Sequence, residues 1–133
     1  MPMAYKVRAS SLPLLPKGAR PIRVLHFSDL HLHPRRKREI ADIKTFIDLR
    51  PDLVISTGDF LAHKDGVDIA LDALDELLDL PGLFVFGSND YYAPKFKNPF
   101  SYLQKDHGER KLGEKLPWQR LQKQLIKRGW IEC

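Results

Sequence analysis

The sequence predicts an α/β domain with a parallel β-α-β-α-β core. Three short apolar runs, at residues 22–28, 53–56 and 83–86, each end in a polar turn. The two segments between them carry apolar residues at intervals of three and four, which is typical of amphipathic helices. Strands that alternate with helices in this way favour one parallel sheet with right-handed crossovers, and 133 residues fit one domain.

Residues 1–21 are expected to form an extended lead-in to this domain. Pro13 and Pro16 exclude a helix there, because proline removes a main-chain donor and clashes with the preceding turn. We expect the leucines of this segment to pack on the domain. The first strand is expected at residues 22–28.

Two helices connect the three strands. The first follows Pro34, carries its apolar stripe on Ile40, Ile43 and Ile47, and ends at Arg50-Pro51. The second begins near Val67 and ends at Pro81-Gly82. Its apolar positions are Val67, Ala70, Leu71, Leu74, Leu77 and Leu78.

The chain after the third strand is less regular. Residues 91–116 lack any period and predict a long loop, which in a compact domain is usually functional or mobile. A third helix is expected at 117–128 with Gly129 at its C-terminal end, followed by a fourth strand at 130–133.

The composition limits the classes of function. Lys and Arg number 22 against 17 Asp and Glu, and the basic residues cluster at 34–38 and 110–115. Such clusters can attract nucleic acid or anionic surfaces, although most are simply solvated. The single cysteine excludes an intramolecular disulfide and suits a cytoplasmic location. We find no signal peptide and no apolar run long enough for a transmembrane segment.

A carboxylate and an imidazole follow the first strand. Asp29 and His31 form a D-x-H pair, and in an extended strand such residues point to the same face. Oxygen and nitrogen ligands on stiff backbone suit a divalent metal such as Zn²⁺, Mn²⁺ or Fe. The other interpretation is a capped strand end with an ordinary surface histidine.

Polar residues recur at the same position after the next two strands. Asp59 lies 30 residues after Asp29, and Asn89 lies 30 residues after Asp59 (59 − 29 = 30; 89 − 59 = 30). One β-α unit occupies about this length, so the three side chains are expected at one edge of the sheet. Gly58 and Gly87 leave room for sharp turns beside a ligand.

Together, S-D-L-H-L, T-G-D and G-S-N-D resemble the first three motifs of the calcineurin-like metallophosphoesterases. The family pattern is D-x-H, G-D and G-N-H-D/E, followed by a lone histidine and G-H-x-H, and the last two are absent here. The resemblance implies that residues 22–133 are the N-terminal half of the family's four-layer α/β/β/α sandwich, with the C-terminal half absent.

The resemblance also implies a site for two divalent metal ions (Mn, Fe, Zn or similar). Asp29 and His31 would bind the first ion, Asp59 would bridge both, and Asn89 would bind the second. The third motif aligns in two ways, with Ser88 or Asn89 as the ligand. We prefer Asn89, which puts Asp90 in the place of the family's catalytic histidine. Without the later histidines, we expect at most weak or single-metal binding.

The implied function is metal-dependent hydrolysis of a phosphomonoester or phosphodiester, incomplete or inactive in this fragment. The alternative is a non-catalytic basic α/β module that binds nucleic acid or anionic surfaces, which we favour less. A third reading is a degenerate family member kept for interaction. An exposed sheet edge also predicts self-association.

The histidines and aromatic residues near the motifs could belong to the site or have a structural or surface role. His33 is expected beside the site or on the surface, and His26, His63 and His107 are weak ligand candidates. The aromatic residues nearby would form either a wall that selects the organic part of a phosphoester or a small core under the loop. These are Phe60, Tyr91, Tyr92, Phe96, Phe100 and Tyr102.

Overall fold

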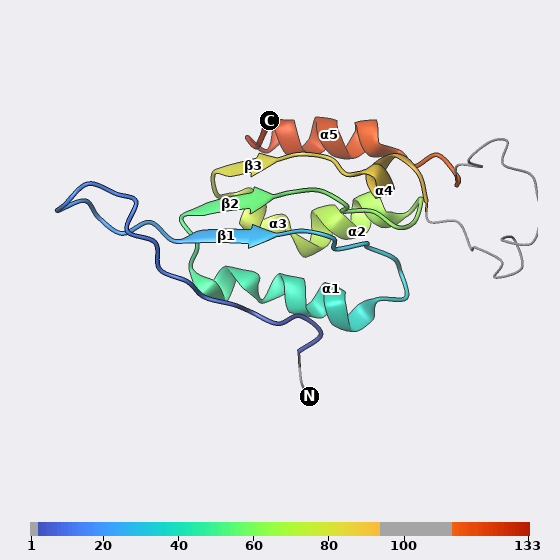
Figure 1. Cartoon of the computed structure of the whole chain (residues 1–133). Helices are drawn as coiled ribbons and strands as arrows, with labels where there is room; N and C mark the ends of the chain where they lie inside the picture. Colours follow the sequence, from blue (N-terminus) through green and yellow to red (C-terminus); the bar gives the residue numbers. More distant parts are fainter. Residues whose placement is uncertain (1–2, 94–112) are drawn as a thin grey trace, which may run out of the picture.

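A four-stranded, all-parallel sheet forms the centre of the molecule (Figure 1). The structure is a computed structural model that describes residues 3–93 and 113–133. The strands are β1 (Val24–Phe27), β2 (Leu53–Ser56), β3 (Gly82–Phe84) and β4 (Ile131–Glu132), and they lie side by side in that order. This arrangement confirms the predicted α/β fold class.

The connecting helices are shorter and more broken than the sequence predicted. They are α1 (Lys37–Lys44), the 3₁₀ helix η1 (Phe46–Leu49), α2 (Gly66–Ala73), α3 (Asp75–Leu78), α4 (Ser88–Tyr91) and α5 (Trp118–Lys127). The first expected helix divides at Thr45, whose hydroxyl donates to the carbonyl of Asp42 at 2.7 Å. The second divides at Leu74, where ψ is 0°. Helix α4 was not predicted, because a single turn has no periodicity to detect.

The two faces of the sheet differ in burial. Consecutive parallel strands joined by right-handed crossovers in one direction place all connecting helices on the same face. Accordingly Val54 and Phe84 are 0% and 1% exposed, whereas Val24 and Ile131 are 48% and 62% exposed. The sheet therefore has one covered face and one open face.

The lead-in prediction needs one correction. Residues 3–23 form no helix or strand, as expected, but Leu12 and Leu14 are 70% and 79% exposed. The prediction that these leucines pack on the domain is therefore wrong. Figure 1 shows why: this part of the chain extends past the start of β1, where no other element lies beside it. Tyr5 does reach the domain, and its ring lies 5.8 Å from that of Phe46.

The long loop after α4 is held together at its base. Tyr92 and Lys115 form an antiparallel bridge, and the Ala93 N–H donates to the Glu114 carbonyl at 2.7 Å. Residues 94–112 lie outside the described part, so the loop prediction is not tested there. None of the helices in the two described ranges is long and apolar enough to cross a membrane.

Candidate metal centre

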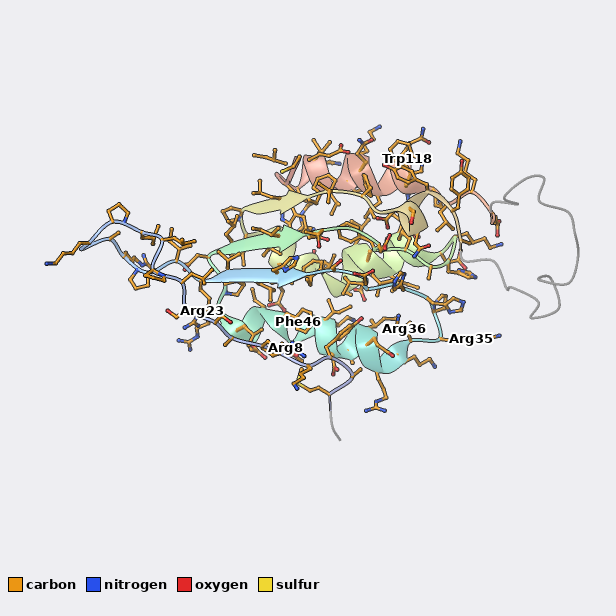
Figure 2. The ribbon with its side chains drawn as sticks, viewed as in Figure 1. Arg8, Arg23, Arg35, Arg36, Phe46 and Trp118 are labelled. Atoms are coloured by element: carbon orange, nitrogen blue, oxygen red, sulfur yellow. The ribbon has the colours of Figure 1, made fainter. Side chains whose placement is uncertain are left out.

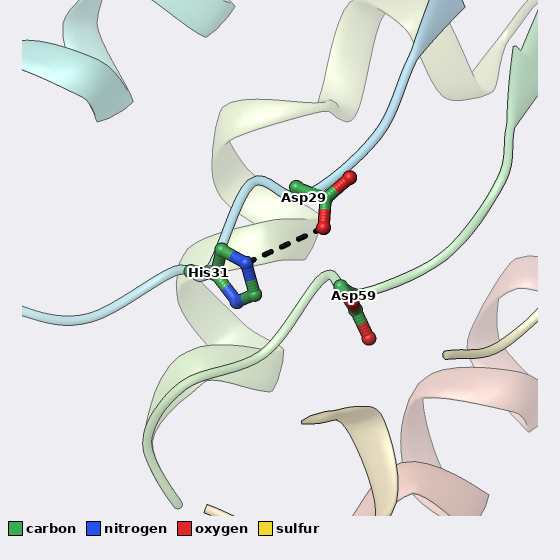
Figure 3. A group of neighbouring side chains, drawn as sticks. All are labelled: Asp29, His31 and Asp59. Carbon is green, nitrogen blue, oxygen red and sulfur yellow. Dashed lines mark ion pairs between the residues drawn. The ribbon is translucent and has the colours of Figure 1, made fainter. Parts of the chain in front are cut away.

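Asp29, His31 and Asp59 converge at the carboxyl ends of β1 and β2 (Figure 3). One potential ligand atom from each side chain lies within 4.8 Å of the other two. Asp29 Oδ1 and His31 Nε2 are 3.5 Å apart. The expected juxtaposition of these three side chains is therefore present, while their role as ligands remains a prediction.

The physical cause of the convergence differs from the one expected. Strand β1 ends at Phe27, so strand alternation does not place Asp29 and His31 together. Instead both residues, and Asp59 as well, adopt left-handed backbone with φ values of 58°, 44° and 57°. Such values are uncommon outside glycine, although Asp and His tolerate them better than most residues.

Main-chain hydrogen bonds join the two ligand-bearing loops. The N–H of Asp29 donates to the Gly58 carbonyl at 3.0 Å, and the N–H of His31 donates to the Asp59 carbonyl at 3.0 Å. Beyond them, Leu32 and Leu61 form a parallel bridge. The loops thus continue the pairing of β1 with β2 past the strand ends, which keeps the strained residues in register.

Gly58 and Gly87 allow the loops after β2 and β3 to touch. Gly58 has φ +104°, and a Cβ there would lie 2.6 Å from the main-chain nitrogen of Gly87. A Cβ on Gly87 would in turn overlap the carboxylate of Asp59. The glycines were expected to allow sharp turns beside a ligand, and Gly58 does adopt a conformation that favours glycine. Both glycines also leave room for the neighbouring loop.

Ser28 adjusts the charge of Asp29. Its hydroxyl donates to Asp29 Oδ2 at 2.5 Å, and this bond is the main reason that the pKa of the Asp29 carboxyl is lowered, with further contributions from Asp59 and His31. The Asp29 side chain is 62% exposed. Asp29 is therefore a carboxylate at neutral pH and is accessible to a cation.

Arg36, the residue just before α1, supports the D-x-H loop, and the sequence analysis missed this role. Its guanidinium Nη1 donates to the carbonyl of Leu30 at 3.1 Å and lies 3.5 Å from the carbonyl of His31. The hydroxyl of Tyr5 also reaches the Leu30 carbonyl at 3.5 Å. The basic run around Arg36 gave no signal that one of its members points inward.

The third motif meets the site through its main chain. The Asn89 N–H donates to Asp59 Oδ1 at 3.1 Å, which helps to orient that carboxylate. Ser88 is exposed and Asn89 half-buried. The metal-binding role expected of the Asn89 side chain remains a prediction.

Asp90 has surroundings unlike those of a residue that contacts substrate. Its side chain is 0% exposed, and its carboxylate accepts the N–H groups of Asp59, Leu61 and Gly87 at 2.8, 2.9 and 2.9 Å. Burial raises the pKa of Asp90, while these main-chain hydrogen bonds oppose the rise. The catalytic role expected of Asp90 is untested, but this geometry does not favour it.

The remaining histidines do not join the cluster. His26 contacts the Thr57 hydroxyl at 3.0 Å, and His33 and His63 pack against each other with ring centroids 4.6 Å apart. Burial, together with His63 and Arg35, lowers the pKa of His33. None of these three belongs to the group of close ligand atoms found among residues 3–93 and 113–133. His107 lies outside the described residues.

The aromatic residues that the structure describes pack mainly against one another. Phe60 is fully buried between Phe27 and Phe86, at ring distances of 6.3 and 6.2 Å. Tyr91 packs on Trp118 at 5.0 Å. These contacts favour the interpretation as a small core for Phe60 and Tyr91. Phe96, Phe100 and Tyr102 lie outside the described residues.

The donor set fits a divalent cation. Two carboxylates and one imidazole at this separation carry excess negative charge, and repulsion between the carboxylates is relieved when a cation binds between them. Mixed oxygen and nitrogen ligands suit Mn²⁺, Fe²⁺ or Zn²⁺.

Comparison with known proteins supports this interpretation. The model of the calcineurin-like phosphoesterase family matches residues 22–130, which include all three motifs and strands β1, β2 and β3 and end just before β4. Neither a comparison with curated proteins nor one with solved structures finds a match. Because the family model covers most of the sequence, the chain belongs to the calcineurin-like phosphoesterase family.

Proposed function

We propose that this chain takes part in metal-dependent hydrolysis of phosphomonoesters or phosphodiesters. The observation that carries the proposal is the cluster of Asp29, His31 and Asp59 at the sheet edge, in a member of the calcineurin-like phosphoesterase family. Asp29 and His31 would hold one cation, Asp59 would lie between two cations, and Asn89 would contribute to the second. Divalent cations in such a site stabilise charge on phosphoryl oxygens and lower the pKa of water.

The chain's own residues prepare the site for a cation. The Ser28 hydroxyl keeps Asp29 deprotonated and fixes one of its oxygens. The Asn89 N–H fixes the position of Asp59 Oδ1 without adding charge. Because the loops are held by main-chain bonds, the cation meets ligands that are already in position.

Metal binding is tested first with the metal alone. We expect Mn²⁺ to raise the melting temperature (Tm) of the chain, since at about 100 times its dissociation constant (Kd) a ligand adds about 2.7 kcal/mol to the free energy of unfolding. Asp59→Asn, which keeps the shape and an acceptor for Asn89, should abolish this shift. The control is Asp72→Asn on α2, whose 70% exposed carboxylate pairs only with Lys44 among the interactions described here.

Activity is then measured with p-nitrophenyl phosphate and bis(p-nitrophenyl) phosphate in the presence of Mn²⁺. Hydrolysis of one substrate that Asp59→Asn removes and Asp72→Asn retains would support the proposal and distinguish monoester from diester chemistry. A Tm that does not respond to Mn²⁺, Fe²⁺ or Zn²⁺ would contradict it.

One observation supports the alternative function, a basic module that binds nucleic acid or anionic surfaces. Arg35, Lys37 and Arg38 are exposed around the start of α1. A basic module would bind an oligonucleotide with an affinity that falls as salt rises and does not change in Asp59→Asn. That result, combined with no response to metal, would favour the alternative over the phosphoesterase proposal.

A further inference from the structure

Asp90 is a buried carboxyl group for which the proposed chemistry has no use. Its side chain is 0% exposed, so no substrate can touch it in this conformation. A carboxylate in such surroundings is costly unless hydrogen bonds compensate it. Asp90 receives three of them, all from main-chain N–H groups.

The two oxygens of Asp90 hold different segments. Oδ1 accepts the N–H of Leu61 at 2.9 Å, in the loop after β2. Oδ2 accepts the N–H of Asp59 at 2.8 Å in the same loop and that of Gly87 at 2.9 Å in the loop after β3. A single side chain therefore joins two of the three loops that form the site.

The influence of Asp90 extends to the D-x-H loop. Its partners Asp59 and Leu61 lie on either side of Phe60, and the carbonyls of Asp59 and Phe60 accept the N–H groups of His31 and Leu32 at 3.0 and 2.8 Å. The left-handed conformation of Asp59, with φ 57°, is thus fixed on one side by Asp90 and fixes His31 on the other.

We propose that Asp90 is a positioning residue, whose buried carboxylate holds the loop after β2 in the conformation that brings Asp59 to Asp29 and His31. The exchange measurements below test this on the protein alone, whereas the effect on metal affinity rests on the proposed function. Asp90 acts through the main chain and touches neither metal nor substrate.

Asp90→Asn is the informative substitution, because it keeps the volume and changes only the hydrogen-bonding groups. An amide has one acceptor oxygen, whereas the carboxylate accepts N–H groups at both oxygens. In either orientation the amide NH₂ faces at least one main-chain N–H. We expect the loop to loosen while the sheet stays intact.

The first measurement is amide hydrogen exchange by NMR without metal. In Asp90→Asn the amides of Asp59, Leu61 and Gly87 should exchange about ten times faster or more than in the wild type, a change equivalent to about one lost hydrogen bond. The amide of Val54 in β2 reports the whole domain and should change less. The control is Ile43→Val, which alters the core beneath α1 and should not single out the three loop amides.

The second measurement is the affinity for Mn²⁺ by calorimetry. Asp90→Asn should weaken binding about 10- to 100-fold, as is typical when a group that orients a metal ligand is removed. Ile43→Val should leave it within about twofold of the wild type. Faster exchange of the loop amides with unchanged Mn²⁺ affinity would overturn the positioning role and leave the proposed function standing.

Two further outcomes keep the inferences separate. If the wild type binds no Mn²⁺, the proposed function fails, and the exchange data alone decide whether Asp90 holds the loop. If Asp90→Asn does not fold, amide hydrogen exchange in the wild type provides the test. The amides of Asp59, Leu61 and Gly87 should then be protected from exchange about as strongly as that of Val54. Exchange of these three amides at the rate of exposed amides would overturn the inference.

Discussion

The two loops that carry the candidate ligands are strained alike but supported differently. Asp29 and His31 after β1, and Asp59 after β2, all have left-handed backbone. In the loop after β1, the partly exposed side chains of Arg36 and Tyr5 donate hydrogen bonds to the Leu30 carbonyl. The Asp29 side chain in this loop is largely exposed. The loop after β2 is held by hydrogen bonds to the buried carboxylate of Asp90 and by the close packing of Gly58 and Gly87.

This difference predicts unequal tolerance to change. A group on the surface can be replaced by water when it is lost, so its removal costs little. A buried group or a glycine in contact with another loop has no such substitute. The loop after β2 should therefore be the more sensitive of the two, and substitutions of graded severity test this.

The largest effect is expected for Gly87→Ala. The new Cβ would overlap the Asp59 carboxylate, so the loops after β2 and β3 must separate. We expect the free energy of unfolding to fall by about 1 to 3 kcal/mol and Mn²⁺ binding to be lost. Chemical denaturation and calorimetry measure the two quantities.

Gly18→Ala is the control, because a Cβ at Gly18 meets no atom within 4 Å. Gly18 has φ +86°, whereas Gly87 is extended with φ −104°, so the control adds backbone strain without contact between loops. This variant should bind Mn²⁺ as the wild type does. Equal loss of metal binding in both variants would show that contact between the loops is not what matters.

An intermediate effect is expected for Arg36→Ala. The loop after β1 would lose its hydrogen bond to the Leu30 carbonyl, worth about 1 kcal/mol, which corresponds to about fivefold weaker Mn²⁺ binding. Arg35→Ala is the control, since Arg35 is exposed and Figure 2 shows it pointing away from the domain. If Arg36→Ala weakens binding more than Asp90→Asn does, the proposed difference between the loops is reversed.

The smallest effect is expected far from both loops, at the ion pair that joins α2 to α5. The Arg120 guanidinium donates to Asp68 at 2.5 Å and lowers the pKa of that carboxyl. A lowered pKa in the folded state means that the pair stabilises the protein above the ordinary carboxyl pKa of about 3.9. This contribution is lost as the pH falls through the lower value of the folded state.

Asp68→Asn should therefore reduce the Tm by on the order of a degree at pH 6 and by nothing measurable once Asp68 is protonated in the wild type. Thermal unfolding of both proteins from pH 6 to pH 2 gives the comparison. A difference that grows toward low pH would contradict the assignment. Mn²⁺ affinity at pH 6 should be the same in both, which provides a baseline for the loop variants.

The order of the elements could be predicted from the sequence because each strand and helix has a local pattern. The run Leu53–Ser56 is a strand with the expected bounds. The equal spacing of Asp29, Asp59 and Asn89 predicted that polar strand ends meet at one edge of the sheet, and the structure brings Asp29 and Asp59 together there with His31. Breaks such as the one at Thr45 depend on a single hydrogen bond of one side chain, which periodicity does not record.

The details of the site were harder to predict because they depend on contacts between loops. The direction of the Arg36 side chain and the burial of Asp90 are properties of the packed structure, and the sequence around each resembles an ordinary basic run or an ordinary helix start. Gly58 and Gly87 did carry a signal: Gly58 adopts the left-handed conformation of a sharp turn, and both glycines also let one loop approach another.

The left-handed backbone of the ligand residues also restricts how the centre can be redesigned. A residue placed at position 29, 31 or 59 must tolerate a positive φ as well as bind the chosen ion. Asn and Asp meet that demand far better than β-branched or bulky side chains. A change of metal preference in this scaffold is therefore better sought in neighbouring groups, such as Ser28, than by exchanging the ligands for cysteine or glutamate.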